Sequence, residues 1–155
     1  NGEYPRDAIE NVAVTMNSFI QAKVAQAIAK VQEEGDSTSS LSQEKFSDDL
    51  AITSMAKLWD IGRSEPIRVG KASPTEGTLP ASVYLILKYV DKEDSLNRAI
   101  QANAMVGGDN ASRSIAIGMV LGAYNGVNSI KKEWLDSLEQ YQYCENLLNK
   151  LPLLK

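Results

Sequence analysis

The sequence predicts an all-α protein built from about six helices. Apolar residues recur three and four positions apart along most of the chain, which is the spacing of one helix face. Runs rich in proline, glycine, serine and aspartate separate these segments, and no alternating run is long enough to predict a strand. With 155 residues, 43% of them hydrophobic, and a single composition regime, we expect one globular domain over residues 1–155.

The first segment, residues 6–34, carries one continuous apolar stripe. Its members are Ile9, Val12, Met16, Ile20, Val24, Ala27, Ile28 and Val31. Pro5 suits the first turn of a helix and Gly35 its end, so we expect one long helix between them. After a polar connector, Ser42 is placed to cap a second helix that extends to about Ile61. The apolar residues of this second helix are Phe46, Leu50, Met55, Leu58 and Trp59.

The middle of the chain predicts a long loop and then two helices. Residues 62–79 combine glycines with two prolines and predict an irregular loop. Pro80 suits the first turn of the third helix, whose apolar residues are Val83, Tyr84, Leu87 and Val90. Asp91 is placed to cap the fourth helix, with Asp94 in its first turn. The fourth helix is expected to bury Leu96, Ala99, Ile100 and Ala104.

The last two predicted helices cover residues 111–124 and 131–150, and Pro152 follows the second of them. Small residues repeat every four positions along the fifth helix, at Ser114, Gly118, Gly122 and Gly126. Because each glycine costs a helix about 1 kcal/mol relative to alanine, we expect this small-residue face to pack closely against another helix. The sixth helix is expected to turn four side chains inward, Trp134, Leu138, Tyr141 and Leu148.

The composition excludes several classes of function. Sixteen basic residues against 20 acidic ones, scattered along the chain, give a net charge of −4 and predict no nucleic-acid partner. Because the chain holds no histidine, it cannot build a Ser-His-Asp or Cys-His catalytic group or a histidine-ligated zinc site. Its longest apolar stretch is about half of what a bilayer-spanning helix needs, so we expect a soluble protein with no membrane span. Neither the single Cys144 nor the start of the chain indicates a compartment.

The most informative stretch is residues 105–126, "MVGGDNASRSIAIGMVLGAYNG". We call Gly107, Gly108 and Asp109, near its start, the glycine-aspartate corner. Two glycines and an aspartate precede the fifth helix there. Asp109 or Asn110 is placed to cap that helix. Alternatively, Asp109 offers a hard oxygen ligand to a cation such as Mg²⁺, and the glycines allow a ligand to approach the backbone. A dinucleotide-binding fingerprint is not met, because no strand precedes Gly107 and the glycine spacing differs.

Three stretches resemble the C-terminal half of the ADP-ribosylglycohydrolases and the related J-type crystallins. They are "GTLPASVYLILKY", "LNRAIQANAMVGGDNASRSIAIGMVLGAYNG" and "IKKEWLDSL", in that order, and they cover about residues 78–138. The resemblance implies an all-α fold. Active members remove ADP-ribose from modified side chains or nucleotides with two magnesium ions. We therefore expect residues 1–155 to form the C-terminal portion of a longer family domain.

The family's corner is typically Gly-Gly-Asp-Thr-Asp-Thr, in which both aspartates and the last threonine are metal ligands. Gly107, Gly108 and Asp109 keep this pattern, and Asn110 stands in the place of the first threonine. Ala111 replaces the second aspartate, and Ser112 replaces the ligand threonine. An alanine cannot coordinate a cation, and Arg113 adds positive charge beside the site. The resemblance thus implies a weakened metal site at Asp109 and Ser112.

The family's second acidic cluster is matched only superficially, by "FSDDLAI". Asp48 and Asp49 in that stretch lack the flanking threonines, and we interpret them as a solvated helix face.

Three hypotheses follow. The first is a non-catalytic, crystallin-like structural or binding subunit, with a protein partner or self-association covering its apolar faces. The second is a magnesium-dependent ADP-ribosyl hydrolase, completed by an N-terminal segment that this chain lacks. The third retains binding of an ADP-ribose-like ligand without turnover, at Gly107, Gly108, Asn110 and Arg113, with the arginine replacing a metal's charge.

Overall fold

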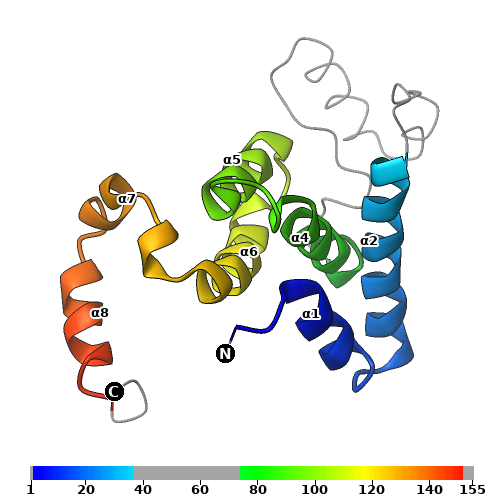
Figure 1. The fold of residues 1–155 in the computed structure, drawn as a ribbon, viewed down its shortest axis with the longest axis horizontal. Coiled ribbons are helices and arrows are strands. Elements are labelled where there is room, and N and C mark those ends of the chain that lie inside the picture. The colour runs from blue at the N-terminus through cyan, green and yellow to red at the C-terminus, as the bar shows by residue number, and fades with distance from the viewer. Residues whose placement is uncertain (1, 37–73, 152–155) are drawn as a thin grey trace.

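The described residues, 2–36 and 74–151 of a computed structural model, are helical and contain no strand, which confirms the all-α prediction (Figure 1). Their elements in chain order are α1 (Pro5–Ala13), α2 (Ser18–Asp36), α4 (Thr75–Tyr89), α5 (Ser95–Val106), α6 (Asn110–Asn125), the 3₁₀ turn η2 (Val127–Ser129), α7 (Lys132–Asp136) and α8 (Tyr141–Leu148). None of the helices in these ranges is long and apolar enough to cross a membrane.

Helix α4 lies at the centre of the fold. It contacts α2 on one side, α5 and α6 on the other, and also α1 (Figure 1). Residues 80–87 are buried without a break, so this helix is covered on every side. A helix that is apolar all round requires such a position, because each face must be removed from water. The buried positions include Val83, Tyr84, Leu87 and Val90, as the sequence predicts.

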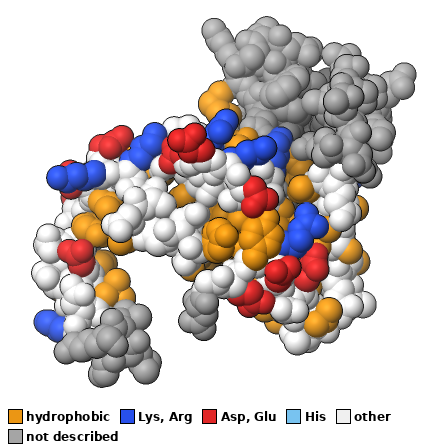
Figure 2. Space-filling view, viewed as in Figure 1, with side chains coloured by type: hydrophobic (Ala, Val, Ile, Leu, Met, Phe, Trp, Pro, Cys, Tyr) orange, Lys and Arg blue, Asp and Glu red, His pale blue; other side chains and the backbone are white. Residues whose placement is uncertain are grey.

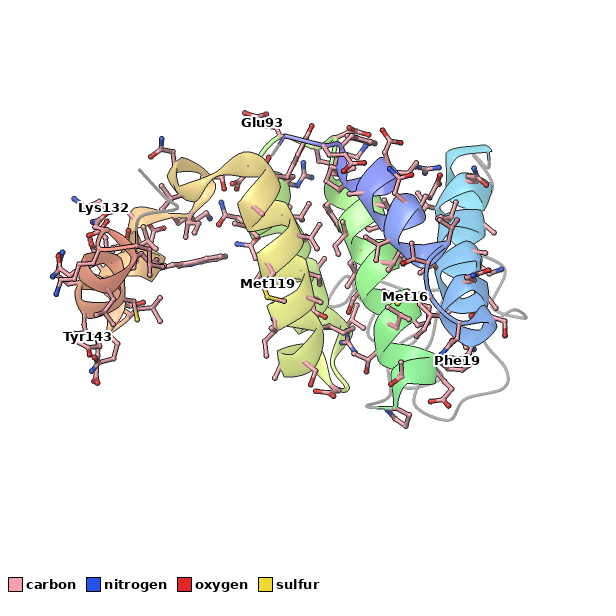
Figure 3. The ribbon with its side chains drawn as sticks, turned by 90° about the horizontal axis from the view of Figure 1, so that it is seen from below. Met16, Phe19, Glu93, Met119, Lys132 and Tyr143 are labelled. Carbon is pink, nitrogen blue, oxygen red and sulfur yellow. The ribbon has the colours of Figure 1, made fainter. Side chains whose placement is uncertain are left out.

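The single helix expected over residues 6–34 is divided into α1 and α2. The chain turns at residues 14–17, and the side chain of Asn17 accepts a hydrogen bond from the backbone N–H of Ile20 at 3.0 Å. This is the bond of an N-cap residue, so Asn17 starts a new helix inside the apolar stripe. As a result, Val24 and Ala27 reach the core, whereas Met16 and Phe19 lie exposed near the turn (Figure 3).

Tyr4 connects the N-terminal residues to the core at two points. Its hydroxyl donates a hydrogen bond of 2.8 Å to Asp91, in the turn between α4 and α5. Its ring meets Tyr124, near the end of α6, edge to face with 6.1 Å between ring centroids. Asp91, predicted as a helix cap, instead accepts this long-range bond, and α5 begins four residues later.

The starts of α4 and α5 differ from the prediction. Helix α4 begins at Thr75, inside the predicted loop, and contains Pro80. The backbone carbonyl of Pro74 accepts bonds from the N–H groups of Gly77 and Thr78, which establishes the first turn before Pro80 is reached. Helix α5 begins after Asp94, whose φ of 56° is left-handed. Leu96 and Ala99 are buried in α5 as predicted, whereas Ala104 is exposed.

The predicted sixth helix is also divided, into α7 and α8, with residues 137–140 between them. The four side chains expected to turn inward do not reach the core: Trp134 and Tyr141 are half-buried, and Leu138 and Leu148 are exposed. The reason is that the segment from Lys131 to Leu151 stands apart from the packed helices (Figure 1). We call this segment the C-terminal arm.

The helix predicted over residues 42–61 and most of the loop predicted over 62–79 lie outside the described residues. The pair Asp48 and Asp49 lies there as well.

Candidate functional site at the α5–α6 corner

Two successive glycines reverse the chain between α5 and α6. Gly107 has a φ of 74° and Gly108 a φ of 66°, both in the region that only glycine adopts at low cost. The N–H of Gly107 bonds the carbonyl of Ala104 and ends α5, and the carbonyl of Gly108 accepts a bond of 2.9 Å from the N–H of Asn110. A Cβ atom at Gly107 would meet nothing within 4 Å, so conformation and not space requires the glycine.

Asp109 caps helix α6, as the sequence predicts. Its side-chain oxygen accepts a bond of 3.3 Å from the backbone N–H of Ser112, three residues into the turn. This bond satisfies one of the N–H groups that have no partner within the helix, and it places negative charge at the positive end of the helix dipole. One role of Asp109 is therefore structural.

Behind the corner lies a buried guanidinium. The side chain of Arg113 is fully buried, and its Nε donates a bond of 2.7 Å to Oδ1 of Asn103. Its Nη2 donates a bond of 2.5 Å to the backbone carbonyl of Gly107. The guanidinium thus joins the end of α5, the glycine turn and the start of α6.

Asn103, on the buried face of α5, completes this arrangement. Its Nδ2 donates to the backbone carbonyl of Asn110 and to Oγ of Ser114, both at 2.7 Å. Asn103 is 0% exposed and holds α6 through three bonds, since its Oδ1 also accepts from Arg113. Sequence reasoning missed Asn103. The available signal was a polar residue four positions after the buried Ala99, within an otherwise apolar stripe.

Burial and a neighbouring carboxylate have opposite effects on the pKa of Arg113. Burial lowers the pKa of Arg113, and the nearby carboxylate of Asp109 acts in the opposite direction by favouring the charged guanidinium. An arginine stays charged even so, because its ordinary pKa is far above neutrality. A fixed positive charge is therefore built into the protein beside Asp109.

The predicted site residues occupy one turn but differ in accessibility. Asp109 and Asn110 are half-buried, Gly108 and Ser112 are exposed, and Arg113 is buried behind them. The exposed methyl group of Ala111 stands on the outer side of the same turn. Ligand binding by Gly107, Gly108 and Asn110 stays a prediction.

The donor set of the corner does not fit a pair of magnesium ions. A two-ion site requires several carboxylate oxygens, and the corner supplies one carboxylate, next to a cationic side chain. Within residues 2–36 and 74–151, no group of three or more His, Cys, Asp or Glu side chains could hold a metal.

On the small-residue face of α6, Ser114 contacts Asn103 of α5, but the glycines are not packed, contrary to the prediction. A Cβ atom at Gly118 or Gly122 would meet nothing within 4 Å. The neighbouring Ile115 and Met119 are 64% and 65% exposed. Instead, the opposite face of the helix, with Ile117 and Leu121, is buried. Among residues 2–36 and 74–151, the glycines therefore do not mark a helix crossing.

Comparison with known families supports the likeness found in the motifs. The family described as ADP-ribosylglycohydrolase matches residues 1–155, a wider span than the motif-bearing residues 78–138. Searches among curated proteins and among solved structures return no match. The family match spans the whole sequence, and the helices and the glycine-aspartate corner agree with it. The chain therefore belongs to the ADP-ribosylglycohydrolase family.

Proposed function

We propose that this chain is a non-catalytic, crystallin-like member of its family that serves as a structural or binding subunit of a larger assembly. The observation that carries the proposal is the buried guanidinium of Arg113. It holds the corner in shape through Asn103 and Gly107, which is a task that a bound cation performs in many acidic sites. The corner therefore has an internal source of positive charge.

A second argument comes from the position next to the cap. Where the family pattern has a ligand aspartate, Ala111 presents a methyl group to solvent. The charge of Arg113 disfavours a divalent cation at Asp109, because like charges at short range repel. The loss of the aspartate ligand at position 111 and the positive charge of Arg113 both weaken the binding of a divalent cation. The hydrolase alternative would require carboxylates from outside this corner.

Binding of an ADP-ribose-like ligand without turnover is compatible with this proposal. The turn at Gly107 and Gly108 leaves the backbone accessible, and the start of α6 offers the positive end of a helix dipole. In such a complex Arg113 would act from behind the corner, through its bond to Gly107. That the chain is the C-terminal portion of a longer domain also stays a prediction.

The experiment is a calorimetric titration of ADP-ribose into the purified protein, in millimolar magnesium and again in chelator. We expect the two titrations to agree, whether they show binding or none, and we expect no release of ADP-ribose from a modified substrate. Binding without magnesium would identify a binding subunit, and no binding would identify a structural one. Binding that requires magnesium, or turnover, would overturn the proposal.

A matched variant makes the titration sharper. Ala111→Asp restores the family's second carboxylate at an exposed position in the first turn of α6, where an acidic residue stabilises a helix by about 0.3–1 kcal/mol. We expect thermal unfolding of the wild-type chain to be insensitive to magnesium and that of Ala111→Asp to rise with it. If the wild-type melting temperature already rises with magnesium, the corner is a metal site and the alanine at position 111 has not abolished metal binding.

A further inference from the structure

The C-terminal arm is an unpartnered part of the fold. None of its residues from Lys131 to Leu151 is buried. Its exposed large apolar side chains are Leu138 (59%), Tyr143 (61%), Leu147 (44%), Leu148 (51%) and Leu151 (49%). In Figure 2 a hollow lies between the arm and the body of the protein, and apolar side chains of the arm border it. A patch of this kind marks an interaction site in a protein that stays in solution.

Helix α8 has the pattern of a helix that packs against another. At roughly 100° per residue, Tyr141, Cys144 and Leu148 fall on one side, and Tyr143 and Leu147 extend that side to an arc of about 160°. The other side carries Gln142, Glu145 and Asn146. An apolar stripe of this width normally faces a core, but here it faces solvent.

The root of the arm is fixed, and this sets the arm's direction. The turn that follows α6 is closed by bonds from Ser129 N–H and Oγ to the carbonyl of Gly126. The buried Asn97 donates a bond of 3.2 Å to the carbonyl of Ser129, and Ile130 packs against the core. The arm therefore leaves the body in a defined direction and does not lie on its own α6.

The outer face of α6 offers a matching surface. Ile115 and Met119 lie one turn apart, with Gly118 and Gly122 beside them, and Figure 3 shows Met119 on the side of α6 toward the arm. Between residues 110 and 130 the only charged residue is Arg113, which is buried, so this stretch exposes no charged side chain. Missing charge is typical of the centre of an interface, and missing side chains allow close approach of a second helix.

We propose that two copies of this chain pair by exchanging arms, with the apolar side of α8 from each copy seated on the outer face of α6 of the other. This inference rests on the assembly role proposed above and names the partner as a second copy. One chain carries both the inserting helix and its receiving face, so a single two-fold rotation satisfies both at once and closes the assembly.

The two surfaces agree in charge. The apolar side of α8 carries no Asp, Glu, Lys or Arg, and neither does the outer face of α6. Pairing them therefore takes no charged group out of water, as at the centre of most interfaces.

The test begins with molecular mass in solution, by size exclusion with light scattering over a dilution series. We expect the wild-type chain to show twice its mass of 16.9 kDa at high concentration. Leu147→Asp places a charge on the apolar side of α8, at a residue that is 44% exposed, and is expected to give the mass of one chain with an unchanged circular dichroism spectrum. Asn146→Asp, the matched control on the polar side, is expected to remain paired.

A second measurement does not depend on a destabilising substitution. Met119→Cys supplies a partner for the native Cys144, which is exposed and is the chain's one cysteine. Mild oxidation is expected to give a covalent pair on a non-reducing gel. Addition of Cys144→Ser should remove this band, and Lys92→Cys, in the exposed turn between α4 and α5, should not form it.

Each other outcome overturns the proposal. An internal disulfide in Met119→Cys, seen as a single-chain band, would mean that the arm folds back on its own α6. A wild-type mass of one chain throughout the series, or a pair that survives Leu147→Asp, would mean that the arm has another partner or none. These results are separate from the magnesium titration, because the mass reports on the arm and the titration reports on the corner.

Discussion

The guanidinium of Arg113 is a buried cation whose bonds connect two helices and the turn between them. A buried charge is costly unless its hydrogen bonds are satisfied. Here Asn103 and the carbonyl of Gly107 satisfy two of the donors, and the carboxylate of Asp109 lies near. The shape of the corner therefore depends on Arg113, which the family resemblance suggests as a ligand-binding residue, and on Asn103, which lies beneath it.

Removal of the amide beneath the guanidinium should be costly. Asn103→Ala deletes the acceptor of Arg113 Nε and both donors to α6, and we expect it to lower the free energy of unfolding by about 2–3 kcal/mol. Urea unfolding measures this loss. Gln101→Ala, at an exposed position of the same helix, is the control and should change stability by less than about 0.5 kcal/mol. Equal losses for the two variants would show that the Arg113 bonds do not stabilise the fold.

Tyr4 gives the fold a defined dependence on alkaline pH. Burial, together with the hydrogen bond and the negative charge of Asp91, raises the pKa of Tyr4 from 10.0 to about 12. A raised pKa means that the folded state favours the neutral phenol. The resulting stabilisation is fully present below pH 10 and is lost as the pH rises through about 12.

Tyr4→Phe should therefore lower stability by about 1 kcal/mol at neutral pH, since it removes one hydrogen bond to a charged but exposed partner. We expect the difference from wild type to be constant below pH 10 and to shrink toward pH 12, as measured by urea unfolding at each pH. Tyr143→Phe, on the exposed arm, serves as the control. A difference that grows with pH would contradict this assignment.

At the scale of the helices, substitution by alanine should have opposite effects on stability at two glycines, one within α6 and one in the turn before it. Gly118 lies within α6 with open space around its Cβ position, so Gly118→Ala should stabilise the helix by up to about 1 kcal/mol. Gly107 has a left-handed φ of 74°, so Gly107→Ala should destabilise by about 1–2 kcal/mol. Thermal unfolding measures the effect of each substitution. It is done in the Leu147→Asp background so that self-association does not affect the comparison. Destabilisation by Gly118→Ala would mean that this face is packed after all.

The helices show what could be predicted from the sequence and what could not. Local signals were reliable where one residue determines the backbone, as at Pro5, which begins α1, and at Asp109, which caps α6. The apolar pattern correctly predicted that Val83, Tyr84 and Leu87 are buried in α4, but not the unbroken burial of residues 80–87. The pattern failed where a polar residue interrupts a continuing stripe, because Asn17 caps a new helix there without any change in spacing.

The candidate site was predictable in position but not in its chemistry. The motif placed the corner correctly, because consecutive glycines before an aspartate predict a turn and a cap. It did not show that Arg113 points inward to Asn103, since that requires knowledge of how α5 packs on α6. Nor did it show that the glycine face is open, because periodicity gives the face of a helix and not its neighbour.

For the whole molecule, the division between body and arm is the main feature. The body is held by α4, whose neighbours cover it on all sides, and by Tyr4, which connects the N-terminal residues to the turn at Asp91 and to the end of α6. The arm contributes no buried residue to this body. Its apolar side chains therefore add little to the packed core of the single chain, which is why we propose that they contact a second copy.

Truncation after Ile130 tests this division. Ile130 and the turn before it remain, so the core keeps every contact that the root of the arm makes with Asn97. We expect the truncated chain to unfold cooperatively with a melting temperature within about 4 °C of that of the Leu147→Asp monomer, because none of the removed residues up to Leu151 is buried and their loss should change stability by no more than about 1 kcal/mol. We also expect it to stay monomeric at concentrations where the wild-type chain pairs. A truncated chain that loses its cooperative transition would mean that the arm supports the body directly, since the removed residues would then have been stabilising the core of the same molecule.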